Sequence, residues 1–384
     1  MFLIAEDWYF LSHRLPLARA CRDQGWDVVI ATRTERHGDA IRSEGFRVIP
    51  IRMRRISRKP AAELATIYEL ISIFAREKPY IVHQVGLKPV IYGSLAAMIT
   101  RTGVVVNALA GMGYIFKSGR LSVRIAREIV KGVIWACLRP RRRWLILQNE
   151  YDASLLVDKG LSRAGHTEII KGSGVDLDKF VPVAEPKGEI VVALVSRMLK
   201  DKGIRETVMA ARELKRRGFK IQIWLVGAPD EGDPTSISKE MLDRWHEEGC
   251  VRWLGHQADV KSVWSKAHIA ILPSYREGMP MALLEAAACG RPIVTTDVPG
   301  CNDLVEDGVS GFLIPQNDWM KLADSIETLA NSADLRARFG AAARKKVEAG
   351  YGQQVVVDQT LALYRKGMDE IGGGTDIGWN PKRS

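Results

Sequence analysis

Short apolar runs alternate with longer amphipathic segments along most of the chain. The runs have little polar alternation, which is typical of strands buried on both faces of a parallel sheet. In the first half the predicted strands are 2–5, 26–32, 46–51, 80–85, 104–110 and 144–149. In the second half they are 189–196, 221–227, 251–255, 268–274, 292–297 and 311–315. Alternating strands and helices predict an α/β fold with right-handed crossovers.

A glycine- and proline-rich segment, 172–189, interrupts this pattern and is the predicted linker. It separates an N-terminal domain, 1–171, from a C-terminal domain, 190–352. The helix pattern at 353–371 is expected to cross back to the N-terminal domain, and 372–384 to form a flexible tail. We expect two doubly wound, Rossmann-like domains facing each other across a cleft. In such sheets ligands bind beyond the carboxyl ends of the strands.

Composition narrows the class of protein. The 384 residues include 56 basic and 45 acidic ones, a net charge of +11 that favours an anionic partner. The 5 cysteines are scattered and form no C-x-x-C pair, which argues against a disulfide framework or a zinc site. No apolar run reaches the roughly 18 residues of a membrane-spanning helix, and residues 1–10 do not resemble a secretory signal. A cytoplasmic protein is expected.

The densest chemical signal lies at 274–285, S-Y-R-E-G-M-P-M-A-L-L-E. A strand ends there and a helix is predicted to start with Pro280 at its first position. Gly278 lets the backbone approach a ligand, and the first-turn amides form an anion site. Glu277 and Glu285 can accept hydrogen bonds from sugar hydroxyls. The alternative is a solvated loop glutamate and a surface helix glutamate.

A second strand-to-helix turn lies at 196–203, S-R-M-L-K-D-K-G. Arg197 and Lys202 bracket this turn, and Gly203 frees the backbone before a helix at 204–217. Two cations at such a turn suit a diphosphate, because charge-assisted hydrogen bonds contribute about 1.5–3 kcal/mol each. The alternative is a solvated basic loop.

Together the two turns resemble the donor site of retaining glycosyltransferases of family 4, which have the GT-B fold. The resemblance covers nearly the whole chain and includes V-G at 226–227, W-L-G-H at 253–256 and G-V-D-x-x-x-F at 174–180. It implies that Arg197 and Lys202 neutralise the donor diphosphate. It also implies that Glu277 contacts the transferred sugar and that Glu285 holds the ribose hydroxyls. The remaining implied donor contacts are Ser196, where the family has glycine, and Gly227, Leu254, His256, Gly278, Met279 and Pro280.

The segment 8–14, W-Y-F-L-S-H-R, resembles the start of a bacterial subgroup that extends sugars linked to polyprenyl diphosphate. The segment 110–114, A-G-M-G-Y, resembles that subgroup's G-L-G segment, where Gly111 and Gly113 would let backbone amides approach donor or acceptor. The histidine that many family members carry near this strand end has no counterpart. His13 and His83 are the remaining candidates on the acceptor side, and a core or helix-cap role is the alternative for each.

A basic segment, 117–143, carries nine cations and one acid, Glu128. Its helical spacing predicts one basic face beside an apolar stripe, which suits an anionic membrane surface. The alternative is a solvated helix whose stripe packs on the domain. No base-stacking aromatic motif accompanies the cations, so no nucleic-acid partner is expected. The residues predicted to face the membrane are Arg120, Arg124, Arg127, Lys131 and Trp135.

The resemblance thus implies transfer, with retention of configuration, from a nucleoside diphosphate sugar, for preference UDP-linked, to a polyprenyl-diphosphate-linked saccharide. The enzyme would act at the inner face of the cytoplasmic membrane in the assembly of a surface glycan such as capsule or lipopolysaccharide. We expect no cofactor and no metal, because protein cations balance the diphosphate. The Asp-x-Asp string at 176–178 is interpreted as structural. A nucleotide-sugar epimerase of the same architecture, or a basic nucleic-acid-binding protein, is the alternative.

Overall fold

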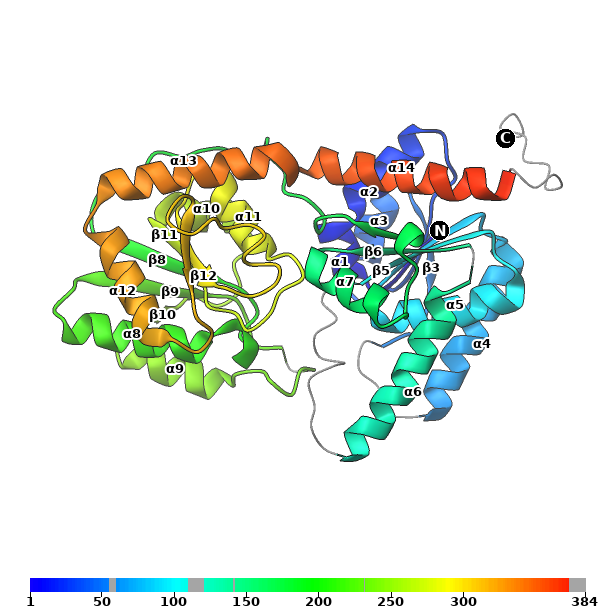
Figure 1. Ribbon diagram of the computed structural model, residues 1–384, viewed down its shortest axis with the longest axis horizontal. Coiled ribbons are helices and arrows are strands. Elements are labelled where there is room, and N and C mark those ends of the chain that lie inside the picture. Colours follow the sequence, from blue (N-terminus) through cyan, green and yellow to red (C-terminus); the bar gives the residue numbers. More distant parts are fainter. Residues whose placement is uncertain (55–59, 110–120, 141, 231, 373–384) are drawn as a thin grey trace. The chain divides into compact units, whose positions relative to one another are not determined.

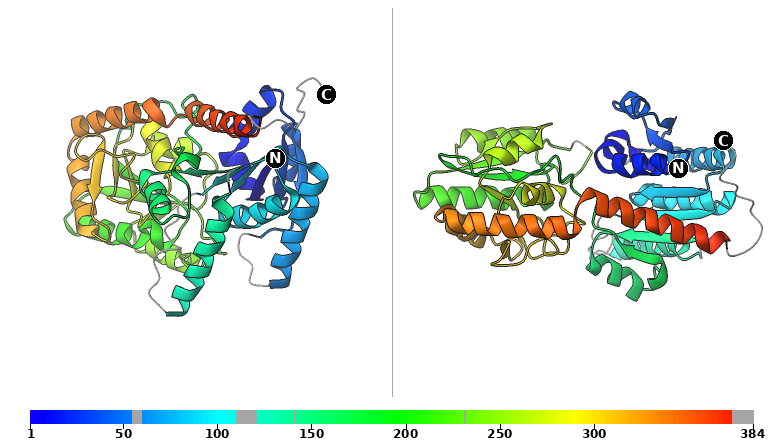
Figure 2. Two further views of the ribbon diagram at one scale, coloured as in Figure 1. Left: turned by 45° about the vertical axis from the view of Figure 1, so that its right-hand side comes forward. Right: turned by 90° about the horizontal axis from the view of Figure 1, so that it is seen from above.

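The chain forms two α/β units, shown by a computed structural model that describes residues 1–54, 60–109, 121–140, 142–230 and 232–372 (Figures 1 and 2). The side chains of 121–127, 129 and 130 lie outside the description. The first unit comprises Met1–Ser173 and the segment from Val356 on, and the second comprises Gly174–Val355.

The first unit contains a parallel seven-stranded sheet of order β3-β2-β1-β4-β5-β6-β7. Its strands are β1 (Phe2–Glu6), β2 (Val29–Arg33), β3 (Arg47–Pro50), β4 (Ile81–Val85), β5 (Val104–Ala108), β6 (Arg143–Leu147) and β7 (Thr167–Ile169). Its helices are α1 (Asp7–His13), α2 (Leu15–Asp23), α3 (Gly38–Ser43), α4 (Pro60–Glu77), α5 (Leu87–Thr100), α6 (Leu121–Leu138) and α7 (Glu150–Asp158), with α14 (Gln353–Gly372) joining from Val356 on.

Alternate residues of each strand bury opposite faces of this sheet, as a period of two requires. Phe2 and Ile4 of β1 pack with residues of α2 and α14. Leu3 lies in a second core with residues of α4 and α5. Both faces are therefore covered, which explains why the strands are apolar throughout.

The second unit contains a parallel six-stranded sheet of order β10-β9-β8-β11-β12-β13. Its strands are β8 (Ile190–Val195), β9 (Ile221–Val226), β10 (Arg252–Trp253), β11 (Ile269–Leu272), β12 (Ile293–Thr296) and β13 (Gly311–Ile314). Its helices are α8 (Ile204–Arg216), α9 (Lys239–Glu247), α10 (Val260–Lys266), α11 (Met281–Ala288), α12 (Trp319–Ala330) and α13 (Ala333–Gly350). Within the described ranges, no helix has the length and apolar content needed to cross a membrane.

Each predicted strand is present, although its ends differ by up to a few residues. The short strand β7 was not predicted, because Thr-Glu-Ile carries no clear apolar run. Most of the predicted linker, 172–189, belongs to the second unit, where Val175 and Phe180 are buried in the core. Glu185 of the same segment accepts a hydrogen bond from Arg336 of α13 at 3.1 Å. Because these residues pack in the second unit, the boundary between the two units lies at Ser173, near the start of the predicted linker.

Candidate active site

In the second unit the strand order reverses between β8 and β11, which are neighbours in the sheet. Such a switch point separates the loops that follow the two strands and creates room for a ligand. The turn after β8 is 196–203 and the turn after β11 is 273–280, so the two sequence motifs meet at one sheet edge. The Tyr275 amide and the Ser274 hydroxyl donate to the Asp201 carbonyl at 2.8 and 2.9 Å.

Two glycines allow the backbone at this edge to pack closely. Gly203 has φ of 71°, and a Cβ there would lie 2.1 Å from the Pro273 carbonyl oxygen. Gly227, after β9, has φ of 142°, and a Cβ would lie 1.8 Å from the Ser196 carbonyl oxygen. Neither position accepts another residue without backbone movement.

Lys202 and Glu277 form the centre of this edge. The Lys202 Nζ donates to the Glu277 Oε1 at 2.6 Å, and the Ser274 hydroxyl donates to the same oxygen at 2.8 Å. The two charged side chains are only 15% and 11% exposed. A shielded ion pair of this kind has a fixed geometry, and its ammonium keeps further N–H donors for a ligand.

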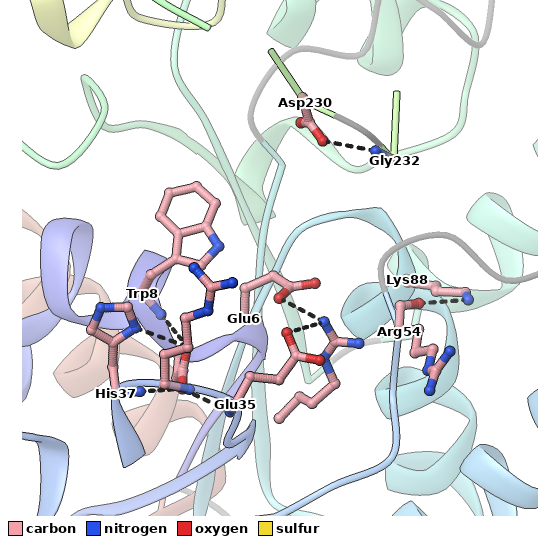
Figure 3. Close-up of polar contacts among 11 residues, drawn as sticks. Glu6, Trp8, Glu35, His37, Arg54, Lys88, Asp230 and Gly232 are labelled. Carbon is pink, nitrogen blue, oxygen red and sulfur yellow. Dashed lines mark hydrogen bonds and ion pairs between the residues drawn. The ribbon is translucent and has the colours of Figure 1, made fainter. Parts of the chain in front are cut away.

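Arg197 extends from the same turn and is more exposed. Its Nη1 donates to the Asp230 Oδ2 at 2.6 Å, and Asp233 lies 4.0 Å away. Asp230 also accepts from the Gly232 amide in the loop after β9 (Figure 3). Arg197 therefore rests on an acidic loop, and an anionic ligand would compete with that loop for the guanidinium.

The loops after β9 and β10 are joined by backbone contacts. The Gly227 amide donates to the Gly255 carbonyl at 2.8 Å, and the Trp253 indole donates to the Gly227 carbonyl at 2.8 Å. Leu254 is partly buried beside them and His256 is exposed. The structure thus brings Gly227 and Leu254 to the same edge as the lysine–glutamate pair.

Helix α11 follows the Glu277 turn. Pro280 is its N-cap residue and the helix begins at Met281, one residue later than predicted. Met279 is buried, and Gly278 precedes it in the turn. Among the residues that the structure describes, Glu285 makes no hydrogen bond with Glu277. Burial raises the pKa of the Glu285 carboxyl to about 7, with Lys179 acting in the opposite direction. A carboxyl held in this costly environment is typical of a functional position.

Two histidines were predicted for the acceptor side, and the structure places one of them, His83, in the core. His83 is buried in the core of the first unit, where its ring stacks on Phe2 and its Nδ1 contacts the Tyr364 hydroxyl. His13 stacks on Tyr9, and burial lowers its pKa to about 4. The contacts of His83 correct the prediction for that residue, because they hold its ring in the core, and the prediction for His13, which is partly buried, stays a prediction. Gly111 and Gly113 lie outside the described residues.

The first unit has its own switch point, between β1 and β4. At the carboxyl ends of β1 and β2, Arg33 lies between Glu6 at 3.4 Å and Glu35 at 2.7 Å. Trp8 is 43% exposed in the same region (Figure 3). An exposed aromatic ring beside carboxylates suits a sugar, which offers C–H groups to the ring and hydroxyls to the oxygens. Of these residues, only Trp8 belongs to a motif recognised in the sequence, the W-Y-F-L-S-H-R segment at 8–14.

A buried carboxylate orders the loop that carries Glu35. Asp7 Oδ2 accepts hydrogen bonds from the amides of Glu35, Arg36 and His37 at 3.0, 3.1 and 2.8 Å. Burial acts to raise the pKa of Asp7, but these amides outweigh it, and the pKa lies below its ordinary value. The position of this acid directly after a strand was the signal available in the sequence.

The predicted membrane helix is described in part. Arg120 lies outside the described residues, as do the side chains of Arg124 and Arg127. Lys131 pairs with Glu128 at 2.7 Å, and Trp135 is 50% exposed.

In the second unit, Asp176 of the Asp-x-Asp string accepts hydrogen bonds from the amides of Asp178 and Lys179, which gives it a role in the turn.

Two family models match the chain. The model of glycosyl transferases group 1 matches residues 177–346, and the model of glycosyl transferase 4-like proteins matches residues 1–136.

Two relatives match over almost their whole length. An N,N'-diacetylbacillosaminyl-diphospho-undecaprenol alpha-1,3-N-acetylgalactosaminyltransferase of Campylobacter jejuni is 25% identical over 94% of this chain and 99% of its own. The capsular polysaccharide biosynthesis glycosyltransferase CapM of Staphylococcus aureus is 24% identical over 94% of this chain and 97% of its own.

Solved structures show the same fold. Sucrose-phosphate synthase of Thermosynechococcus elongatus superimposes with a TM-score of 0.79 at 20% identity, over 96% of this chain and 99% of its own. HepE of Anabaena, solved with UDP and glucose, superimposes with a TM-score of 0.75 at 17% identity, over 95% and 98%. The fold is therefore GT-B, and the chain is a glycosyltransferase whose C-terminal region matches group 1 and whose N-terminal region matches the 4-like model.

Proposed function

We propose that the enzyme moves a sugar from a nucleoside diphosphate sugar, UDP-linked for preference, to a polyprenyl-diphosphate-linked saccharide, with retention of configuration. The Lys202–Glu277 pair at the switch point of the second unit carries the proposal. It combines a cation for a diphosphate with a carboxylate for a sugar. The name of the Campylobacter relative supports the polyprenyl acceptor, and HepE, solved with UDP and glucose, supports the donor.

The chemistry follows from these charges. Breaking the bond to the sugar leaves negative charge on the diphosphate, and Lys202 and Arg197 stabilise that charge as it develops. Arg197 reaches the phosphate by leaving Asp230, an exposed pair whose loss costs little. Glu277 Oε1 is occupied by Lys202 and Ser274, so Oε2 accepts from a hydroxyl of the transferred sugar. The departing phosphate oxygen accepts the proton of the attacking hydroxyl on the same face.

The other predicted donor groups line the rest of the ligand. Backbone groups near Gly227 and Leu254 would contact the base, with His256 at the rim. Glu285 would accept from the ribose hydroxyls, and the amides at Gly278 and the start of α11 would face the diphosphate. A donor screen that measures nucleoside diphosphate release, with and without a polyprenyl-linked acceptor, tests the whole assignment. Release that never depends on an acceptor, or a donor sugar changed without one, would refute it.

We propose an anionic membrane surface as the site of action, in bacterial surface polysaccharide assembly. Adjacent helices of the first unit expose large apolar side chains: Leu64 and Tyr68 on α4, Leu95, Met98 and Ile99 on α5, and Trp135 on α6. Helix α5 contacts both α4 and α6, so the three form one layer. Exposed apolar groups on α6 and on the helices of its layer, together with the basic sequence of α6, suit a lipid interface.

Vesicle co-sedimentation tests this surface. Met98→Glu with Ile99→Glu should release the protein from anionic vesicles. Met209→Glu is the matched control, because Met209 is similarly exposed on α8 of the second unit. Equal binding of both variants would remove the α5 surface from the proposal without affecting the transferase assignment.

A further inference from the structure

A small cavity inside the first unit is lined by hydrogen-bond donors and by no carboxylate. Its volume is about 10 Å³, which holds about one water molecule or a monatomic ion. The polar residues of its lining are His13, Arg14, His83, Ser173 and Thr360, and the others are apolar or glycine.

Arg14 is the charged residue of this lining, and it is only 6% exposed. Its Nη1 donates to the His13 carbonyl at 3.1 Å, and its buried Nε has no partner. Among the residues that the structure describes, no carboxylate lies within ion-pair distance of this guanidinium. A buried cation without a counter-charge is unfavourable by several kcal/mol.

His83 provides the second unused group, and it is 2% exposed. Its Nδ1 contacts the Tyr364 hydroxyl, and its Nε2 is buried without a partner. The Thr360 hydroxyl already donates to the Val356 carbonyl at 2.7 Å, and His13 Nδ1 already contacts the Ser12 hydroxyl at 2.6 Å. Arg14 Nε and His83 Nε2 are therefore the buried side-chain polar atoms of this lining that have no partner among the described residues.

We propose that this cavity binds a monatomic anion of the chloride class between the Arg14 guanidinium and the His83 Nε2. A water molecule would satisfy the two donors but would leave the guanidinium charge uncompensated. An oxyanion such as sulfate is too large for the volume. The Tyr364 hydroxyl donates to Nδ1, so that Nε2 carries the imidazole proton and donates it to the anion.

The bound anion stabilises the part of the first unit where the chain leaves and re-enters it. Gly172 and Ser173 precede the crossing to the second unit, and Val356 and Val357 follow the return. All four line the cavity. The cavity belongs to the first unit, and the Lys202–Glu277 pair belongs to the second.

Thermal unfolding of the full chain at constant ionic strength tests the proposal, with sodium gluconate replaced by chloride, bromide or sulfate. At millimolar anion, where the general stabilising effect of sulfate is negligible, chloride and bromide should raise the melting temperature by about 2 °C or more, and sulfate should not. Arg14→Met should abolish the halide response. Arg19→Met should keep it, because Arg19 is an exposed residue of α2 that pairs with Glu44.

Should Arg14→Met not fold, His83→Phe replaces it, since phenylalanine keeps the packing on Phe2 but has no donor. Loss of the halide response in His83→Phe supports the site. Crystals soaked in bromide should show an anomalous peak between Arg14 and His83. Equal melting temperatures in gluconate and chloride, a response of the same size in sulfate, or a halide response retained by both variants would each overturn the proposal.

Discussion

The two units share a doubly wound parallel sheet but differ at the edge formed by the carboxyl ends of the strands. In the second unit this edge is compact. Gly203 and Gly227 pack so closely against the backbone of neighbouring turns that a Cβ at either position would clash, and Lys202 forms a largely buried ion pair with Glu277. The described part of this edge in the first unit, called the open edge, carries Trp8, which is 43% exposed, and Arg33 between two carboxylates.

This difference fits a division of labour. A diphosphate is a small group of fixed charge and geometry, and two short turns are sufficient to hold it. The saccharide acceptor of the proposed reaction is larger and offers hydroxyls in several directions, and we propose that its recognition is spread over the loops that follow β1 and β2. The compact edge is consequently easier to recognise in a sequence than the open one.

Loss of the cation in the compact edge should have the largest effect. Lys202→Ala should lower turnover by about 10²–10³-fold, because it removes charge stabilisation from the leaving diphosphate. Steady-state kinetics with a saturating donor measure this, and circular dichroism checks the fold. Lys200→Ala is the matched control, since Lys200 is exposed on the same turn. A Lys202→Ala enzyme within tenfold of the parent would exclude the assigned role.

Backbone packing at that edge should also tolerate little change. Gly227→Ala should destabilise the second unit by about 3 kcal/mol, because its Cβ would lie 1.8 Å from the Ser196 carbonyl oxygen. Gly218→Ala is the control: its φ is also positive, at 86°, but nothing lies within 4 Å of a Cβ there. Urea unfolding compares the two. Similar losses of stability would show that positive φ, and not the close approach, sets the penalty.

The partly buried acid on α11, Glu285, should make stability depend on pH. The pKa of Glu285 is about 7 in the folded protein against 4.5 unfolded, so ionisation destabilises the fold as pH rises from 4.5 through 7. Glu285→Gln should therefore be more stable than the parent by about 2 kcal/mol at pH 8. This gain should shrink toward pH 5. Urea unfolding at both values measures it, and a gain that is the same at pH 5 and pH 8 would contradict the shift.

The open edge should respond more weakly and only toward the acceptor. Trp8→Ala should raise the acceptor KM by about 2- to 10-fold and leave the donor KM unchanged, since loss of an aromatic contact is worth about 0.5–1.5 kcal/mol. Tyr151→Ala is the control, because Tyr151 is a 54% exposed aromatic residue on α7 of the same unit. A change confined to the donor KM would move Trp8 to the other substrate.

Local pattern and spacing were informative where function depends on contiguous residues. The strands of both sheets are continuous apolar runs, because burial on two faces leaves no polar alternation. The turns 196–203 and 274–285 each carry their chemistry within a dozen residues. The Lys202–Glu277 contact then follows from topology, since neighbouring parallel strands present their carboxyl ends at one edge.

The sequence by itself therefore determined the α/β class, the order of strands and helices along the chain, and the two turns that meet at the edge after β8 and β11. Only the tertiary structure decided which polar residues are inside. His83 follows the same apolar pattern whether it faces a ligand or a core, and its pairing opposite Phe2 beneath Tyr364 decided the question. Arg33 and Glu6 belong to different strands and meet only through sheet register. Burial and long-range pairing depend on residues far away in the chain, so no local pattern contains them.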